Sequence, residues 1–229
     1  MRADVIGFLL SAIRFVAAAS AHDPDDPKSC NTAAWRDGRV LTVAKVTQPR
    51  VHFIKSRSED GREVEGCPAA IEACRTKSYL VAGDIVLVGK TQGDFTCVSY
   101  KAPQEKAQIW TTNWLPNAAL APVVPMPSPT TSDWIGRWCH PGCSIEITKA
   151  DGDGLHVEGL MLVQAGQETR NGSFDARVTP RNGTIRFDDG YDDGCRVRMQ
   201  RVGALLLVQD NGVCGGYGVT FTGLYRRKN

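Results

Sequence analysis

Apolar and polar residues alternate with a period of two along most of the chain between residues 40 and 116. The alternating segments lie at 40–46, 51–54, 78–81, 85–88, 95–100 and 111–116. Successive side chains of a β-strand point to opposite faces of a sheet, so this pattern predicts short strands that bury one face. Residues around Gly83 and the run from Gly89 to Gly93 predict turns, and the charged run 55–65 predicts a surface loop.

The same alternation returns after residue 133. Its segments lie at 144–148, 155–163, 172–178, 184–187, 195–202, 205–209 and 219–225. They are separated by Gly, Asn and Asp, which are the residues that turns of an up-and-down meander use. With the entry around Trp138, about eight short strands are expected, and an antiparallel barrel would remove their exposed edges. The fold class predicted for the whole chain is all-β.

A proline-rich run separates the two halves. Residues 121–133 contain four prolines, which fix φ, remove backbone donors and push preceding residues into extended conformations. We therefore expect a semi-rigid spacer with neither a helix nor a central strand. This predicts two domains, at 30–120 and 134–229.

Composition excludes some classes of protein. Of the 229 residues, 42% are hydrophobic and the net charge is +2, which is unlike a disordered chain. Nucleic-acid binding normally needs a concentrated basic excess, and this balance gives no reason to expect it.

The first 21 residues predict a signal peptide. Met1-Arg2 precedes an apolar run that ends in Ala19-Ser20-Ala21, a small-x-small cleavage pattern. The charged Asp4 and Arg14 interrupt the run and leave an uncleaved anchor as the alternative. The run is short for a membrane-spanning helix, which needs about 20 apolar residues. A periplasmic or secreted protein, with no membrane span after cleavage, is therefore expected.

The chain has eight cysteines, an even number that predicts four disulfides in an exported protein. Three expected pairs are close in sequence, and elimination joins the remaining two cysteines across the first domain. Cys139-His140-Pro-Gly-Cys143 also has spacing that can ligate zinc, but no second Cys/His pair lies near it. The expected pairs are Cys67–Cys74, Cys139–Cys143, Cys195–Cys214 and Cys30–Cys97.

The first half resembles the bacterial Src-homology-3-like barrel domains of exported proteins. The resemblance rests on Tyr79-Leu-Val-Ala-Gly-Asp84, Val86-Leu-Val88, Phe95-Thr-Cys-Val98 and Thr112-Asn-Trp-Leu-Pro116, over roughly residues 39–123. Asn113 stands where that family usually has glycine, so the closing turn departs from the pattern. The resemblance implies a small barrel that binds a peptide or a cell-wall component, although a fold alone does not transfer a function.

The second half resembles the calycins, the lipocalin-like barrels, in Gly136-Arg137-Trp138 and Tyr225-Arg226-Arg227. In that superfamily a late arginine packs over the tryptophan, which implies a cation–π contact. The whole segment after the spacer also resembles a recurring C-terminal domain of uncharacterised exported α-proteobacterial proteins, which brings no activity with it. Its motifs include Cys195-Arg-Val-Arg-Met199 and the run 210–226.

Candidate chemistry is sparse. Four aspartates crowd the loop 188–193 but lack the order of a calcium-binding loop, so a solvated hairpin tip is the preferred interpretation. His22, His52, His140 and His156 show no nucleophile or metalloprotease motif. We expect no enzymatic activity, no cofactor and no metal.

The leading functional hypothesis is a binding module for a peptide or cell-envelope component. Its expected contacts are rim aromatics of the first barrel: Tyr79, Tyr100, Trp110 and Trp114. The first alternative is a periplasmic inhibitor of a lysozyme-type hydrolase, with the acidic 188–193 hairpin facing a basic enzyme. The second is a carrier of a small apolar ligand, whose barrel cavity would have a lining of leucines and one valine: Leu155, Val157, Leu160, Leu162, Leu205 and Leu207.

Overall fold

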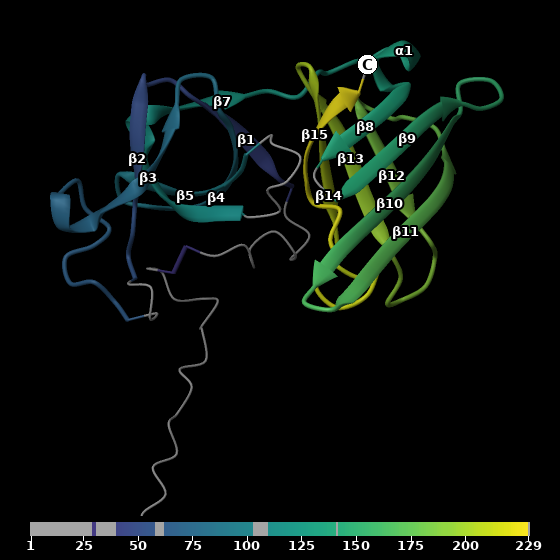
Figure 1. Cartoon of the computed structure of the whole chain (residues 1–229). Helices are drawn as coiled ribbons and strands as arrows, with labels where there is room; N and C mark the ends of the chain where they lie inside the picture. Colours follow the sequence, from purple (N-terminus) through teal and green to yellow (C-terminus); the bar gives the residue numbers. More distant parts are fainter. Residues whose placement is uncertain (1–28, 31–39, 58–61, 103–109, 141, 229) are drawn as a thin grey trace, which may run out of the picture.

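The computed structural model describes residues 29–30, 40–57, 62–102, 110–140 and 142–228. The protein is all-β, as predicted, and two antiparallel sheets lie side by side (Figure 1). The predicted signal segment 1–21 lies outside the described residues. Within those residues, no helix has the length and apolar character that crossing a membrane requires.

The first sheet curls around a core of its own and is called the first barrel below. It has seven strands in the order β3-β2-β6-β5-β4-β1-β7. The predicted turn that begins at Gly89 is shorter, because β4 continues past Gly89 with a shift of register against β5 between Val88 and Thr91. The chain reverses at Gly93, whose φ of 54° suits glycine. The strands are β1 (Thr42–Val46), β2 (Arg50–Ile54), β3 (Arg75–Val81), β4 (Ile85–Gln92), β5 (Phe95–Lys101), β6 (Trp110–Pro116) and β7 (Leu120–Val123), with short 3-10 turns η2 (Glu72–Cys74) and η3 (Asn117–Ala119).

The predicted spacer is more structured than its prolines suggest. Leu120–Val123 forms β7, which pairs with β1 at the edge of the first sheet. Thr131–Trp134 forms the helix α1, so the expectation that no helix forms in this run is wrong. The side chain of Asp133 accepts a hydrogen bond from the Thr130 backbone N–H, a capping interaction that begins the helix beyond the last proline. Irregular backbone is confined to residues 124–130.

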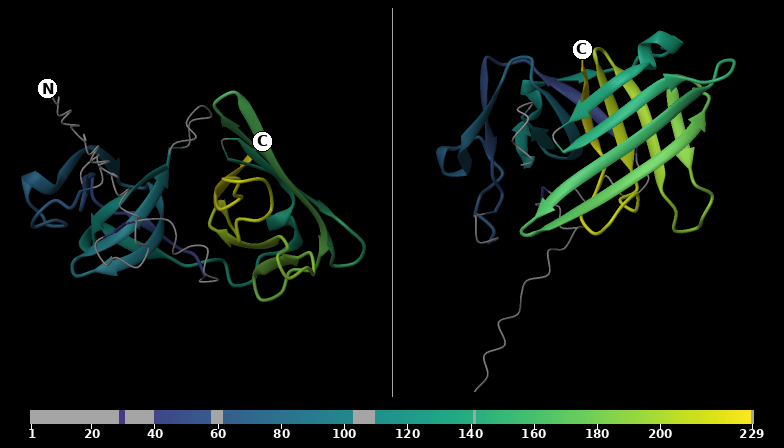
Figure 2. Two further views of the ribbon diagram at one scale, coloured as in Figure 1. Left: turned by 90° about the horizontal axis from the view of Figure 1, so that it is seen from below. Right: turned by 45° about the vertical axis from the view of Figure 1, so that its right-hand side comes forward.

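The second sheet has eight strands in the order β11-β10-β9-β8-β15-β14-β13-β12 and is nearly closed into a barrel. Its two longest strands, β10 and β11, cross the outer wall beside β9 (Figure 2). The strands are β8 (Gly136–His140), β9 (Cys143–Lys149), β10 (Leu155–Ala165), β11 (Glu168–Val178), β12 (Thr184–Asp188), β13 (Arg196–Val202), β14 (Leu205–Asp210) and β15 (Gly223–Lys228).

The interior of the second barrel is filled by its own side chains. Trp134, Trp138, Phe221 and Tyr225 are all fully buried in one apolar cluster. On β10 a glycine, Gly159, makes room for the ring of Phe174. A packed interior of this kind is what a barrel of about eight strands can hold.

The predicted cavity lining is partly wrong. Leu155 and Val157 point inward, but Leu160 and Leu162 are 48% and 47% exposed on the outer wall. They follow the same strand but lie one residue out of phase with the buried set. Leu207 packs toward the first barrel instead of into the second.

The predicted arginine contact with Trp138 is present. The guanidinium carbon of Arg227 lies 4.8 Å from the ring centroid, and that of Arg201 lies 4.4 Å from it. Arg227 also donates to backbone carbonyls of Ser132 and Asp133. These contacts tie α1 to the last strand.

The two barrels share a buried apolar cluster. Leu41, Val43 and Leu87 of the first barrel pack with Val202 and Leu207 of the second. The backbone N–H of Leu41 also donates to Oε1 of Gln209 at 3.1 Å. The barrels are therefore packed against each other and not merely connected by a spacer.

Three of the four predicted disulfides are present. They are Cys30–Cys97, Cys67–Cys74 and Cys195–Cys214. Such bonds indicate an oxidising compartment outside the cytoplasm.

The fourth predicted disulfide is wrong, because Cys139 and Cys143 are free. In the hairpin of β8 and β9, Cys139 pairs with Ser144 and His140 pairs with Cys143. Cys139 therefore faces outward while Cys143 faces the barrel interior, since neighbouring positions in a strand point to opposite sides. The same geometry prevents the two sulfurs from ligating one zinc ion.

Candidate functional site

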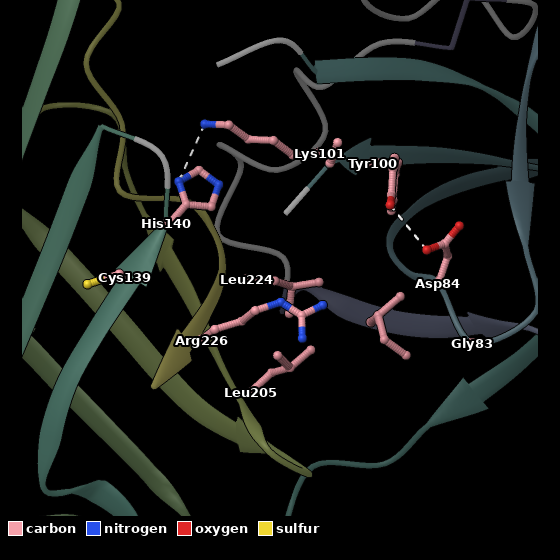
Figure 3. Close-up of a pocket in the computed structure, with 11 residues that line it drawn as sticks. Gly83, Asp84, Tyr100, Lys101, Cys139, His140, Leu205, Leu224 and Arg226 are labelled. Atoms are coloured by element: carbon pink, nitrogen blue, oxygen red, sulfur yellow. Dashed lines mark hydrogen bonds between the residues drawn. The ribbon is translucent and has the colours of Figure 1, made fainter. Parts of the chain in front are cut away.

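A cleft lies between the two barrels and receives side chains from both (Figure 3). The first barrel supplies the β3–β4 turn and the end of β5. The second supplies the end of β8, the start of β14, and β15. The lining residues are Gly83, Asp84, Ile85, Tyr100, Lys101, Ala102, Cys139, His140, Leu205, Leu224 and Arg226.

Tyr100 and Asp84 form the polar pair on the first-barrel side. The Tyr100 hydroxyl donates to Oδ1 of Asp84 at 3.1 Å, and Oδ2 of Asp84 accepts the backbone N–H of Val81 at 2.9 Å. Burial, reinforced by the negative charge of Asp84, raises the pKa of Tyr100 to about 12. Tyr100 therefore stays a neutral donor at physiological pH, and Asp84 is held in place by two donors.

Lys101 reaches across the cleft to the second barrel. Its Nζ lies 3.4 Å from Nδ1 of His140 and 5.7 Å from the ring centroid of Trp110. Burial lowers the pKa of Lys101 to about 8, because partial removal from water disfavours the ammonium form. Lys101 is thus a cation at neutral pH that titrates within the reach of ordinary buffers.

His140 occupies a tight position at the end of β8. Its ring centroid lies 5.1 Å from that of Tyr225 and 5.9 Å from that of Trp110. A Cβ at Gly223 would lie only 3.1 Å from its Nε2, so the absence of a side chain at Gly223 makes room for the ring. Packing from both barrels therefore fixes the orientation of the imidazole toward Lys101.

Behind His140 lies a buried thiol. Sγ of Cys143 is 2.9 Å from the Tyr225 hydroxyl, which itself donates to the carbonyl of Phe221 at 2.8 Å. Because the tyrosine proton is used there, the thiol is the donor to the tyrosine oxygen. Burial raises the pKa of Cys143 to about 12, so this thiol is protonated at neutral pH. It lies behind the cleft as a hydrogen-bond donor to Tyr225.

The described lining of the cleft carries more positive than negative side chains. Arg226 projects into it from β15 (Figure 3) and forms no ion pair with any described residue. Among the described residues that line the cleft, Lys101 and Arg226 face one carboxylate, Asp84, which accepts two hydrogen bonds. Such an arrangement attracts an anionic group.

The four aromatic residues predicted as ligand contacts do not form one surface. Tyr100 lines the cleft, and Trp110 packs in the apolar cluster between the barrels, where it also contacts His140 and Lys101. Tyr79 is 46% exposed on β3, where Arg50 lies 4.3 Å from its ring centroid, and it is not among the residues that line the cleft.

The prediction that Trp114 is an exposed ligand contact is wrong. It is 0% exposed, and its indole N–H donates to the Ser56 hydroxyl at 3.1 Å. It packs beside the disulfides Cys30–Cys97 and Cys67–Cys74 in a separate buried cluster. Its size and its hydrogen bond therefore stabilise the first barrel.

Three cleft residues were not singled out as contacts by the sequence: Lys101, His140 and Arg226. Lys101 ends β5 and His140 ends β8, whereas Arg226 lies within β15. His140 and Arg226 belong to the second barrel and Lys101 to the first. The alternation of a strand predicts which face a residue occupies, but not which strand end of another barrel will lie opposite. The only sequence signal was the position of His140 between two cysteines.

The loop after β12 is held rigidly by its own aspartates. The carboxylate of Asp189 accepts the backbone N–H groups of Tyr191 and Cys195, at 3.1 and 2.7 Å. Arg196 donates to the Asp188 carboxylate and to the carbonyls of Tyr191 and Asp192. These contacts give the tip of the hairpin a defined shape.

This chain matches no model of a known protein family, no curated protein and no solved structure. The chemistry of the cleft therefore carries the functional proposal.

Proposed function

We propose that this protein is an exported, non-enzymatic binding protein that holds an acidic peptide or cell-envelope fragment in the cleft between its barrels. The observation that carries the proposal is the convergence of Lys101, Arg226 and His140 from two barrels on one cleft. The three disulfides and the signal-like first 21 residues support a periplasmic or secreted location.

The side chains suit binding better than catalysis. Tyr100 and Cys143 have raised pKa values and keep their protons, and the carboxylate of Asp84 is fixed by two donors. A carboxylate ligand would accept hydrogen bonds from the Lys101 ammonium and the Arg226 guanidinium. The half-buried Trp110 beside Lys101 offers an optical reporter of such binding.

The test is direct binding to the oxidised mature chain, residues 22–229, at pH 7. Soluble cell-wall fragments bearing peptide carboxylates are titrated while tryptophan emission and heat are followed. We expect saturable binding that weakens about tenfold or more in Lys101→Gln and in Arg226→Gln, because each loses a charge-assisted hydrogen bond. The matched control is Lys149→Gln, an exposed lysine at the far end of β9.

Amidation of the ligand carboxylates is the complementary change. It should weaken binding to the wild-type protein, and it should weaken binding to Arg226→Gln by a smaller factor, because only Lys101 is left to contact the carboxylate. Binding that is unaffected by both cleft variants and by amidation would refute the cleft as the site. Turnover of the fragments would refute the non-enzymatic assignment.

A second candidate function has its own observation. The loop 189–195 is braced by Asp189, by Arg196 and by the disulfide Cys195–Cys214, and it presents Tyr191 with 75% exposure. A rigid loop with an exposed aromatic and acidic neighbours is suited to dock on a basic protein, because little entropy is lost on binding. This favours the inhibitor of a lysozyme-type hydrolase as the alternative.

The inhibitor proposal is tested by lysozyme assays with a molar excess of the oxidised protein. Inhibition should fall at least tenfold in Tyr191→Ala and should decline as salt screens Asp192 and Asp193. Tyr217→Ala, which removes another highly exposed tyrosine, is the control. Full lysozyme activity at every concentration would exclude this function and leave the cleft proposal unaffected.

A further inference from the structure

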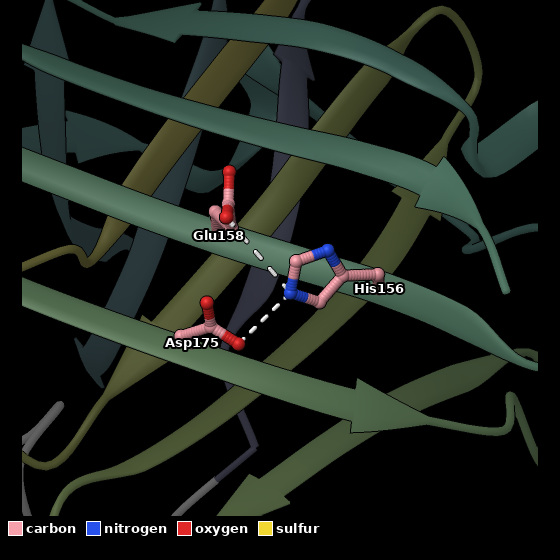
Figure 4. A group of neighbouring side chains, drawn as sticks. All are labelled: His156, Glu158 and Asp175. Carbon is pink, nitrogen blue, oxygen red and sulfur yellow. Dashed lines mark hydrogen bonds and ion pairs between the residues drawn. The ribbon is translucent and has the colours of Figure 1, made fainter.

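The outer wall of the second barrel carries a histidine and two carboxylates that meet at one point (Figure 4). His156 and Glu158 project from β10 and Asp175 from β11, and one ligand atom of each lies within 4.8 Å of the others. Nε2 of His156 is 2.9 Å from Oδ1 of Asp175 and 3.9 Å from Oε1 of Glu158. This cluster lies outside the cleft described above.

Strand register places these residues together. On β10, His156 and Glu158 are two positions apart and share the outward face, and Asp175 pairs directly with Glu158. The strands are held by a continuous ladder from Leu155 to Ala165, so the backbone that carries the three side chains is regular. The Cα positions of the three residues are therefore fixed, and rotation of their side chains alone would bring the three ligand atoms to one ion.

The register also creates a row of like charges. Glu158 pairs with Glu146 of β9 on one side and with Asp175 of β11 on the other. Like charges directly opposite each other in a sheet are destabilising. Arg137 pairs with Glu146, and Arg177 pairs with His156, yet neither forms an ion pair with these carboxylates in the described structure. A cation would relieve this repulsion.

We infer that His156, Glu158 and Asp175 form a binding site for a divalent transition-metal ion of the Zn²⁺ class. Imidazole nitrogen selects such ions over Mg²⁺ and Ca²⁺, which prefer oxygen ligands alone. Zn²⁺ holds tetrahedral ligands at about 2.0–2.2 Å, which places neighbouring ligand atoms about 3.4 Å apart. The 2.9 and 3.9 Å separations fall on either side of this value. Three protein ligands leave one coordination position for water or for a donor from a partner.

The inference is tested on the full oxidised chain at pH 7.5, after treatment with EDTA and its removal. Titration with Zn²⁺ should show one site per chain, and Co²⁺ should give the visible absorption of a four-coordinate ion. Removing a residue that only hydrogen-bonds a metal ligand already weakens metal binding by about tenfold or more. Removing the direct ligand in His156→Ala should therefore weaken Zn²⁺ binding by more than about tenfold. Asp175→Asn and Glu158→Gln should each weaken it similarly.

Matched controls separate this site from others. His52→Ala removes a histidine of the first barrel, and Glu168→Gln removes a carboxylate elsewhere on β11 that pairs with Arg170. Both should bind Zn²⁺ as the wild type does. A sulfur-to-cobalt charge-transfer band in the near ultraviolet would instead assign binding to the free thiols and would overturn the inference.

Thermal unfolding distinguishes a metal site from an ordinary ion pair. In EDTA, Glu158→Gln should unfold at the same temperature as the wild type or higher, because it removes repulsion in the row. With Zn²⁺ it should unfold at a lower temperature than the wild type, which alone gains stability from the bound ion. If the wild type shows no Zn²⁺-dependent shift, or if His156→Ala shows the same shift, the cluster is an ion pair only and the inference fails.

Discussion

The two free thiols at the cleft differ in how well they are protected from reagents. Cys143 is buried and its pKa is raised to about 12, whereas Cys139 is partly accessible and lines the cleft. Thiolate is the reactive form, so Cys143 should resist modification in the native state. Cys139 should be the site that a thiol reagent reaches.

The first prediction concerns these two thiols. In native protein at pH 8, a chromogenic disulfide reagent should modify one thiol per chain, and in denaturant it should modify two. Cys139→Ser should abolish the native reaction, while Cys143→Ser should leave it intact. Zero thiols in denaturant would mean that a fourth disulfide forms and that the hairpin geometry is different.

Lys101 provides a prediction of pH dependence. Because its pKa is lowered to about 8, its charge is lost at a lower pH than that of an exposed lysine. Affinity for a carboxylate ligand should therefore fall between pH 7 and 9, while Tyr100, whose pKa is raised to about 12, stays protonated. Lys101→Gln should bind more weakly and lose this dependence. Equal affinity of the wild type at pH 7 and 9 would contradict a binding role for the ammonium group.

Loss of the Lys101 proton lowers ligand affinity but raises the stability of the native state. Between about pH 8 and 10.5 the unfolded chain keeps the Lys101 proton that the native protein has lost. The unfolded state then binds more protons, so this group makes the native state more stable as pH rises through that window. A loss of ligand affinity above pH 8 is therefore not a sign that Lys101 has unfolded the cleft.

At the scale of elements, β10 depends on a missing side chain. A Cβ at Gly159 would lie 2.2 Å from Cε1 of Phe174, which packs in the barrel core. Gly159→Ala should destabilise the protein by about 1–3 kcal/mol, the usual cost of overpacking a core. Chemical denaturation measures this, with Gly216→Ala as the control because a Cβ at Gly216 meets nothing within 4 Å. Equal losses in both would mean that the contact with Phe174 is not the cause of the destabilisation.

Elements with clear alternation could be predicted from the sequence, and those set by packing could not. The alternating run around Leu155 and Val157 gives β10 its inward face, yet Leu160 and Leu162 look equally apolar in the sequence and lie outside. The edge strand β7 was not predicted, because it contains Pro122 and proline disfavours a central strand. An edge strand tolerates the missing backbone N–H of a proline.

The candidate site was less predictable than the strands. Tyr100 was found because it is an aromatic residue at the end of a strand, but Trp114 has the same sequence character and is fully buried. Lys101 and Arg226 belong to different barrels, and only the docking of the barrels brings them to one cleft. No periodicity within one barrel encodes that approach.

At the scale of the whole molecule, the site exists only while the barrels stay packed. Leu207 of the second barrel is buried against Val43 and Leu87 of the first. The segment 124–130 reinforces this arrangement, since the backbone N–H of Met126 donates to the carbonyl of Arg201 at 2.8 Å. Folding and ligand binding should therefore be coupled across the interface.

Leu207→Asp tests that coupling, because it places a carboxylate in the shared apolar cluster without touching the interior of either barrel. The wild type should unfold in a single calorimetric transition, and the variant should show two as the barrels separate. Binding of acidic fragments should fall together with the coupling, because Lys101 and Arg226 no longer face one cleft. Leu162→Asp makes the same substitution on the outer wall and should preserve both properties. If Leu207→Asp separates the transitions yet binds normally, one barrel alone carries the ligand, and the cleft proposal must yield to a site within that barrel.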